Sequence, residues 1–233
     1  MRLLSTQQRM RNERMVPSVL ALCSTSRESE AQGGNTFHLF ANFGYYMLES
    51  ARYLGAKQLF EAAVSIVRRV APDQPQTIAR SLNSLAETLR VLGDFVGAET
   101  LHQESLSIWR ESTPAEHADL VRCLNNLALL YQGQGRLSDA RRAFEECLTL
   151  LDSSSPQDLS AQGICLNNLA ETLRLAGDYV TAEAMYQKAL TALQEHCLRE
   201  QVQPEHHPDI LTLQNNLATT YELRADYERS EEH

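Results

Sequence analysis

The residues of this sequence best suited to recognition chemistry are asparagines, and they come in pairs. Leu-Asn-Asn-Leu-Ala occupies 124–128 and again 166–170, with a near-copy at 82–86 and another at 214–218. Asparagine is a poor helix former, yet here it recurs inside strongly apolar segments. Its side-chain amide both donates and accepts hydrogen bonds, so a ladder of such amides could pair with the backbone of an extended peptide of any sequence.

Signals for catalysis or metal binding are thin. The segment EHHPD at 205–209 has two histidines and two carboxylates, but adjacent histidines diverge on a helix and the segment is typical of a helix start. GQGRLS at 133–138 lacks the last glycine of a dinucleotide fingerprint and the lysine of a P-loop. Neither H-E-x-x-H nor G-x-S-x-G occurs. We therefore expect no enzyme, no metal and no cofactor.

Composition narrows the class of protein further. A net charge of −9 argues against nucleic-acid binding, which needs a basic surface. No apolar run approaches the roughly 18 residues of a membrane span, and the first residues lack the apolar core of a signal peptide. The five cysteines are odd in number, widely spaced and without a C-x-x-C pair, which predicts reduced core thiols in a cytoplasmic protein.

The asparagine pairs belong to a repeat. Leu85, Leu127 and Leu169 are spaced by 42 and 42 residues, Leu217 follows after 48, and counting 42 back from Leu85 reaches Phe43. Each of three units then continues with a glycine, an alanine five residues later and a larger residue four places beyond: Gly93, Ala98 and His102; Gly135, Ala140 and Phe144; Gly177, Ala182 and Tyr186.

This pattern is similar to the signature of the tetratricopeptide repeat (TPR). The 42-residue unit with "NNLA" and His207-Pro208-Asp209 resembles the TPR array of kinesin light chains, and such units also resemble sensor arrays of STAND-type (NACHT and NB-ARC) signalling ATPases. The resemblance covers roughly residues 37–233. It implies a protein-interaction module that binds a peptide or partner segment in a concave groove, or alternatively a regulatory sensor fragment of a larger STAND-type ATPase.

Apolar periodicity independently predicts two helices per unit, divided by a glycine turn. First helices are expected at 36–51, 76–92, 117–133, 160–176 and 208–224, and second helices at 54–70, 95–111, 137–152 and 179–198. Alanines at equivalent places should let paired helices approach closely: Ala86 and Ala98, Ala128 and Ala140, Ala170 and Ala182. Trp109 is expected in the core. Units this amphipathic must stack, so we expect an all-α, right-handed solenoid of antiparallel helix pairs.

The two ends of the array are expected to be irregular. Residues 1–35 are predicted to hold a degenerate helix at 7–22 and a flexible loop, SRESEAQGGN, ahead of a 36–233 array of about four full repeats and a truncated fifth. The last second helix is expected to have about one turn, in ADYERSEEH. So short a helix would leave some of the apolar surface of the final first helix uncovered, and we therefore expect self-association through 209–233. The apolar residues concerned are Leu211, Leu213, Leu217, Tyr221 and Leu223.

The TPR resemblance places the asparagine pairs on or near the concave side. Our candidate groove residues are Arg80, Asn83, Glu87, Arg90, Arg122, Asn125, Asn126, Gln132, Asn167, Asn168, Glu171, Arg174, Asn215, Asn216 and Glu222. Two alternatives stay open. The amides could bridge neighbouring first helices, or bond water, and bind no ligand, and the Glu87–Arg90 and Glu171–Arg174 pairs could be solvated helix pairs. Asparagines stand where TPR clamps for C-terminal carboxylates carry lysines, which argues against a carboxylate ligand.

Overall fold

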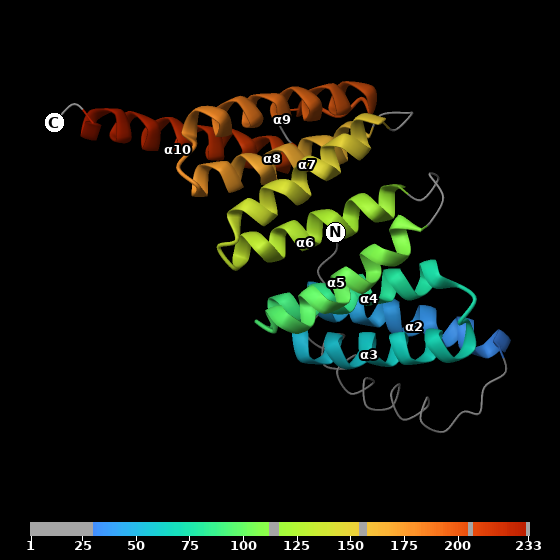
Figure 1. Ribbon diagram of the computed structural model, residues 1–233. Helices are drawn as coiled ribbons and strands as arrows, with labels where there is room; N and C mark the ends of the chain where they lie inside the picture. The colour runs from blue at the N-terminus through green and yellow to red at the C-terminus, as the bar shows by residue number, and fades with distance from the viewer. Residues whose placement is uncertain (1–29, 112–116, 154–157, 205–206, 232–233) are drawn as a thin grey trace. The chain divides into compact units, whose positions relative to one another are not determined.

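The computed structural model describes residues 30–111, 117–153, 158–204 and 207–231. Within these ranges the chain forms α-helices and no strand (Figure 1). The helices are α2 (Glu30–Glu49), α3 (Tyr53–Val70), α4 (Pro75–Val91), α5 (Phe95–Arg110), α6 (His117–Gly133), α7 (Leu137–Ser153), α8 (Leu159–Leu175), α9 (Tyr179–Arg199) and α10 (Pro208–Glu231). From α3 to α9 each expected helix boundary lies within one residue of the observed one.

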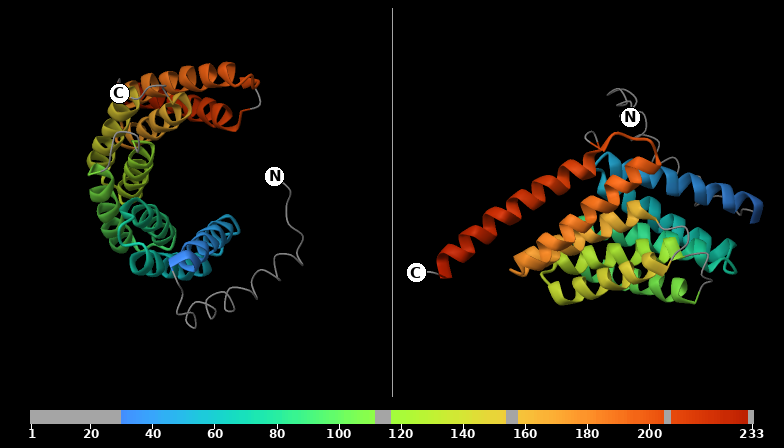
Figure 2. Two further views of the ribbon diagram at one scale, coloured as in Figure 1. Left: turned by 90° about the vertical axis from the view of Figure 1, so that its right-hand side faces the viewer. Right: turned by 90° about the horizontal axis from the view of Figure 1, so that it is seen from above.

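The chain divides into two compact units, Met1–Ser112 and Thr113–His233. The first unit stacks the pair α2–α3 on the pair α4–α5, and the second stacks α6–α7 on α8–α9 and ends with α10. Partners in a pair run antiparallel (Figures 1 and 2). The predicted all-α solenoid of stacked helix pairs is confirmed.

Glycine turns reverse the chain between the two helices of a repeat. Gly93 and Gly177 have φ of +84° and +82°, a left-handed conformation that glycine adopts at little cost. Around Gly177, its own N–H and that of Asp178 donate to the carbonyls of Arg174 and Leu173, at 3.0 Å each, which closes the end of α8. Asp178 then caps α9 by accepting the N–H of Thr181 at 3.1 Å. One Gly-Asp dipeptide thus ends one helix and starts the next.

The core is built from the residues that define the repeat. The six alanines expected where paired helices approach are all fully buried, as are the residues at the signature's aromatic position, His102, Phe144 and Tyr186. Trp109 is 3% exposed, as expected for core packing.

The described cysteines are free and buried, as predicted: Cys123, Cys147, Cys165 and Cys197. The Cys147 thiol donates to the carbonyl of Val121 at 3.5 Å, which joins α7 to α6. A hydrogen bond with Cys165 and burial both raise the pKa of Cys147, so it stays a protonated packing group. Cys23 lies outside the described residues.

Two expectations about the ends of the array need correction. Helix α2 begins at Glu30, so residues 30–35, expected in a flexible loop, are helical; residues 1–29, with the expected helix at 7–22, lie outside the described part. Helix α10 runs unbroken to Glu231 instead of ending near 224 (Figure 2). Its Leu223–Tyr227 segment, LRADY, lacks the glycine of the equivalent LRLAGDY at 173–179, so nothing there stops the helix.

Among the described helices, none is both long enough and apolar enough to cross a bilayer.

Candidate functional site

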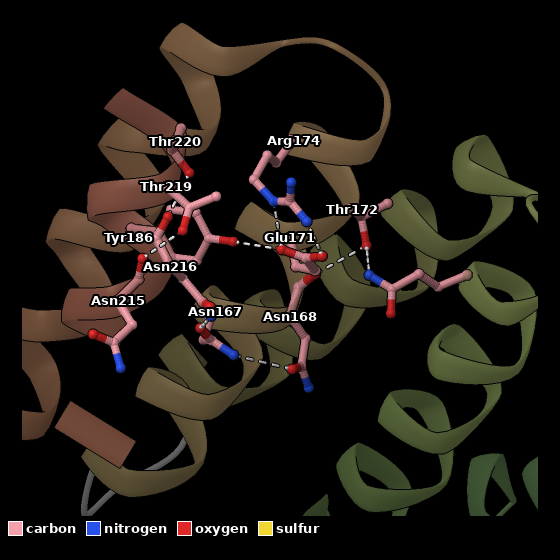
Figure 3. A network of polar contacts seen from close by, with 11 residues as sticks. Asn167, Asn168, Glu171, Thr172, Arg174, Tyr186, Asn215, Asn216, Thr219 and Thr220 are labelled. Atoms are coloured by element: carbon pink, nitrogen blue, oxygen red, sulfur yellow. Dashed lines mark hydrogen bonds and ion pairs between the residues drawn. The ribbon is translucent and has the colours of Figure 1, made fainter. Parts of the chain in front are cut away.

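Asparagine amides from three first helices of the second unit form one hydrogen-bonded row. The Nδ2 of Asn216 on α10 donates to Oδ1 of Asn167 on α8 at 3.1 Å. Asn167 donates in turn to Oδ1 of its neighbour Asn168 at 3.3 Å, and Asn168 donates to Oδ1 of Asn125 on α6 at 3.1 Å. Figure 3 shows the α8 part of this row. The row links α10, α8 and α6 head to tail.

The row shows that these amides bridge neighbouring first helices, as one of the alternatives above expected. Each amide still has hydrogen-bonding groups that the row does not use. An asparagine amide has two N–H donors and two acceptor lone pairs. Asn167 and Asn168 each use one donor and one acceptor in the row, and both residues are half-buried, so solvent still reaches part of each of them. The bridges therefore also hold the amides in fixed positions.

Asn215 extends the row at its α10 end. It holds the register position of Asn125 and Asn167, which accept a hydrogen bond from the next first helix. Its side chain is exposed and makes no hydrogen bond with any described residue (Figure 3). Asn215 thus belongs to the repeated asparagine pattern, but its side chain does not bridge two of the described helices.

Threonines that follow the asparagine pairs bond the backbone of the row's helices. Thr172 Oγ1 donates to the carbonyl of Asn168 at 2.9 Å and accepts the side-chain N–H of Gln132 at 3.1 Å, a second link between α8 and α6. Thr220 makes the same bond to the carbonyl of Asn216 at 2.7 Å. Sequence reasoning missed these threonines, although their recurrence four residues after Ser84, Asn168 and Asn216 was a visible signal.

Glu171 and Arg174 form a partly buried ion pair that a tyrosine completes. Arg174 Nε and Nη2 donate to the two Glu171 oxygens at 2.8 and 2.5 Å, and the Tyr186 hydroxyl donates to Oε2 at 2.8 Å. Burial would raise the pKa of Glu171, but the bonds from Arg174 and Tyr186 outweigh it and lower that pKa. Burial and the bond to Glu171 raise the pKa of Tyr186. The trio fastens α8 to α9, a role the sequence did not reveal for Tyr186.

The first unit differs from the second at the positions of the asparagine pairs. Asn83 is 6% exposed, and the place of a second asparagine is taken by Ser84, whose hydroxyl lies 2.6 Å from the Tyr45 hydroxyl. Arg80 places its guanidinium 5.6 Å from the ring centroid of Trp109. Glu87 and Arg90 form a bidentate pair at 2.6 and 2.9 Å, and the bond to Glu87 raises the pKa of Arg90.

Three further candidates in the second unit are Arg122, Asn126 and Glu222. Arg122 is exposed and pairs with Asp119 on its own helix. Asn126 is half-buried, and Glu222 is exposed on α10. The structure thus brings together Asn125, Asn167, Asn168 and Asn216, with Gln132 beside them, and leaves Arg122 and Glu222 outside that network.

A cavity opens beside the amide row at the junction of α8, α9 and α10. It measures about 230 Å³ and is lined by Asn167 and Asn168 together with Ile164, Leu193 and Leu213, with Asp209 at the start of α10. Ile164 is 42% exposed, so the lining combines accessible apolar surface with the two amides. This combination suits a peptide side chain whose backbone bonds the row.

The first unit has a counterpart cavity of about 450 Å³ between α2, α3 and α4. Its α4 lining residues Thr77, Arg80 and Ser81 stand in the register of Asp209, Thr212 and Leu213. Ala41 lines it in the register of Asn167, and the smaller side chain leaves more room. The same place between successive first helices is therefore hollow in both units.

No group of three or more histidine, cysteine or acidic side chains that could hold a metal ion occurs in the part of the chain that the structure describes.

Two family models, both described as tetratricopeptide repeat, match residues 77–153 and 164–209, together more than half of the chain. The chain belongs to the tetratricopeptide repeat family. TPR units mediate protein–protein interactions, so this protein is an interaction scaffold of the TPR kind. No curated protein sequence matches it.

Solved TPR structures resemble the chain in fold. BtubC (BKLC) from P. vanneervenii superposes with a TM-score of 0.74 at 17% identity, over 98% of this chain and 88% of that one. A putative kinesin light chain with nearly identical TPR-like repeats, from Podosopora anserina, gives 0.65 at 18%, over 88% and 92%. The apo form of RapI gives 0.68 at 14%, over 82% and 65%. The resemblance to kinesin-light-chain-type TPR arrays is thus confirmed.

Proposed function

We propose that the second unit binds an extended segment of a protein partner along the row formed by Asn125, Asn168, Asn167 and Asn216, and along Asn215 at the α10 end of that row. The observation that carries this proposal is the head-to-tail hydrogen bonding of these four amides across three helices. Each bridging bond fixes an amide, and a fixed amide loses little side-chain entropy when a ligand arrives.

The chemistry of the row suits a peptide backbone. A backbone presents alternating N–H and C=O groups, and an asparagine amide can bond either of them. Such pairing supplies affinity without reading sequence, so selectivity must come from side-chain pockets. The cavity beside Asn167 and Asn168 supplies one, with Ile164 and Leu213 for an apolar group and Asp209 for a polar or basic one.

The proposal is tested by nuclear magnetic resonance with a peptide selected on this chain from a random display library. The reporters are the side-chain NH2 resonances of Asn167, Asn168 and Asn216. We expect them to shift on titration, because the peptide backbone bonds their remaining N–H and C=O groups. Shifts confined to second helices, with these three resonances unmoved, would contradict a groove built on the row.

A regulatory role inside a STAND-type ATPase is the alternative that the family resemblance suggests. It stays a prediction, because it depends on sequence outside this chain. A P-loop ATPase domain encoded in the same reading frame would support it, and a complete gene without one would remove it.

A further inference from the structure

One face of helix α10 repeats a surface that is covered in the preceding repeats. In α8, the residues that pack on the second helix are Gly163, Leu166, Leu169, Ala170 and Leu173, and all five are buried. The same register in α4 holds Ala79, Leu82, Leu85, Ala86 and Leu89, which are also all buried. In α10 this register holds Leu211, Gln214, Leu217, Ala218 and Tyr221, here called the open face.

The open face is accessible to solvent. Leu211 is 47% and Tyr221 44% exposed, Gln214 and Ala218 are exposed, and Leu217 is half-buried. The exposure of Ala218 differs most from that of its counterparts, because Ala86 and Ala170 are 0% exposed. The opposite side of α10 is well packed, with Leu213 2% exposed and Thr220 fully buried. Of the five apolar residues named from the sequence, Leu211 and Tyr221 are thus exposed, Leu217 and Leu223 are half-buried, and Leu213 is buried.

Up to Glu231, where the described residues end, the chain does not fold back on the open face. In earlier repeats a glycine reverses the chain and the second helix returns along the first, whereas α10 continues without a break to Glu231. Its later residues face α9 instead: Arg224 pairs with Glu183 at 2.9 Å, and the Tyr227 ring lies 6.0 Å from that of Tyr179. The continuation adds to the α9–α10 contact. The described residues leave the open face uncovered except at the Tyr221 hydroxyl, which accepts the side-chain N–H of Gln187 on α9 at 3.3 Å.

We propose that a second copy of this chain covers the open face, with the two α10 helices antiparallel about Ala218. Each helix pair in the array buries an alanine from both helices, such as Ala170 and Ala182. A twofold pairing about Ala218 would reproduce this arrangement, alanine opposite alanine, because the face would meet itself. Charge favours the same place: the chain carries −9, yet residues 210–221 contain no Asp, Glu, Lys, Arg or His, so two copies can approach there without like-charge contact.

The test is multi-angle light scattering of the full chain from micromolar to millimolar concentration. We expect the mass to rise towards twice that of the monomer. Ala218→Glu should raise the dimer dissociation constant by at least about tenfold, because the pairing would bury two unpaired carboxylates. Since Ala218 is exposed within one chain, circular dichroism and the melting temperature should stay as in the parent.

The adjacent Thr219→Glu is the matched control, since Thr219 is also exposed on α10 but lies outside the open face. It adds the same charge to the same helix and should dimerise like the parent. A parent that is monomeric throughout the series overturns the proposal. So does an Ala218→Glu chain that still dimerises, or a Thr219→Glu chain that fails to.

Discussion

The side-chain N–H of Asn168 donates to Oδ1 of Asn125 at 3.1 Å, between residues 43 positions apart in the chain. The bond joins the second asparagine of one repeat to the first asparagine of the preceding one, and Asn216 bonds Asn167 in the same way. The pairs are therefore offset, so that one row of amides runs across all three first helices of the second unit. The side chains that we propose to bind a peptide therefore also join neighbouring helices.

Asn168 should contribute to stability, because it both donates to Asn125 and accepts from Asn167. Replacing it with alanine removes two half-buried hydrogen bonds, which we expect to lower the free energy of unfolding by about 1–2 kcal/mol. Urea denaturation measures the change. Asn215→Ala is the control, since its exposed side chain makes no bridge, and it should stay within about 0.5 kcal/mol of the parent. Equal losses in both variants would refute a bridging role specific to Asn168.

Replacing Ala182 with a larger residue should destabilise the chain, because Ala182 is 0% exposed between α8 and α9. Ala182→Leu forces a branched side chain into a packed helix pair and should destabilise the chain by about 1–3 kcal/mol. Ala184, two residues along the same helix, is exposed, and Ala184→Leu should leave the melting temperature almost unchanged. If the two leucine variants melt alike, the helix register argued above is wrong.

Glycine should be required at position 177 because of the backbone conformation there, and not because a larger side chain would clash. Its φ is +82°, and an added Cβ would meet nothing within 4 Å. Gly177→Ala should thus cost about 1–2 kcal/mol, the penalty of a left-handed alanine. Gly133 ends α6 without a positive φ and is equally open, so Gly133→Ala should be neutral or stabilising by up to about 1 kcal/mol. Thermal melts compare the two, and a neutral Gly177→Ala would contradict the turn geometry.

His102 should make the first unit sensitive to acid. Burial, followed by the charge of Arg90, lowers the pKa of His102 from 6.5 to about 4. Above pH 6.5 the imidazole is neutral in both the folded and the unfolded chain, so the full stability is present. As pH falls from 6.5 towards 4 the unfolded chain gains a proton that the folded chain does not, and stability should drop by up to about 3 kcal/mol.

His102→Phe tests this dependence, because Phe144 fills the same place in the next repeat. Denaturant unfolding at pH 7 and pH 5 should show a smaller difference for the variant than for the parent. The same pH dependence in both chains would assign the effect to other groups.

Much of the fold could be predicted from the sequence because the same pattern of residues recurs in successive helix pairs. Three copies of glycine followed by alanine five residues later set the helix boundaries of α4 to α9 to within one residue. The prediction failed in α10, where the last copy lacks the glycine: the helix simply continues, as helices do without a stop signal.

The candidate site could be predicted only in part. Residue types and register pointed to Asn125, Asn167, Asn168 and Asn216, but which amide bonds which depends on the stagger of neighbouring helices, and that is a property of packing. For the same reason the Tyr186 bond to Glu171 was missed, since the signature identifies that position only as a packing aromatic. In the first unit the amide positions hold Ala41 and Asn42 on α2 and Asn83 and Ser84 on α4, so two of the four amides are replaced there.

The central claim, that the amide row binds an extended peptide, is tested most directly by the affinity of one library-selected peptide for two variants. Asn215→Ala removes an exposed amide in line with the row, and Lys188→Ala removes an exposed charge on the second helix α9. Measured by fluorescence anisotropy, Asn215→Ala should weaken binding by about tenfold, the loss expected for one or two hydrogen bonds, while its melting temperature stays unchanged. Lys188→Ala should bind like the parent. Undiminished affinity of Asn215→Ala, or an equal loss in Lys188→Ala, would contradict the account.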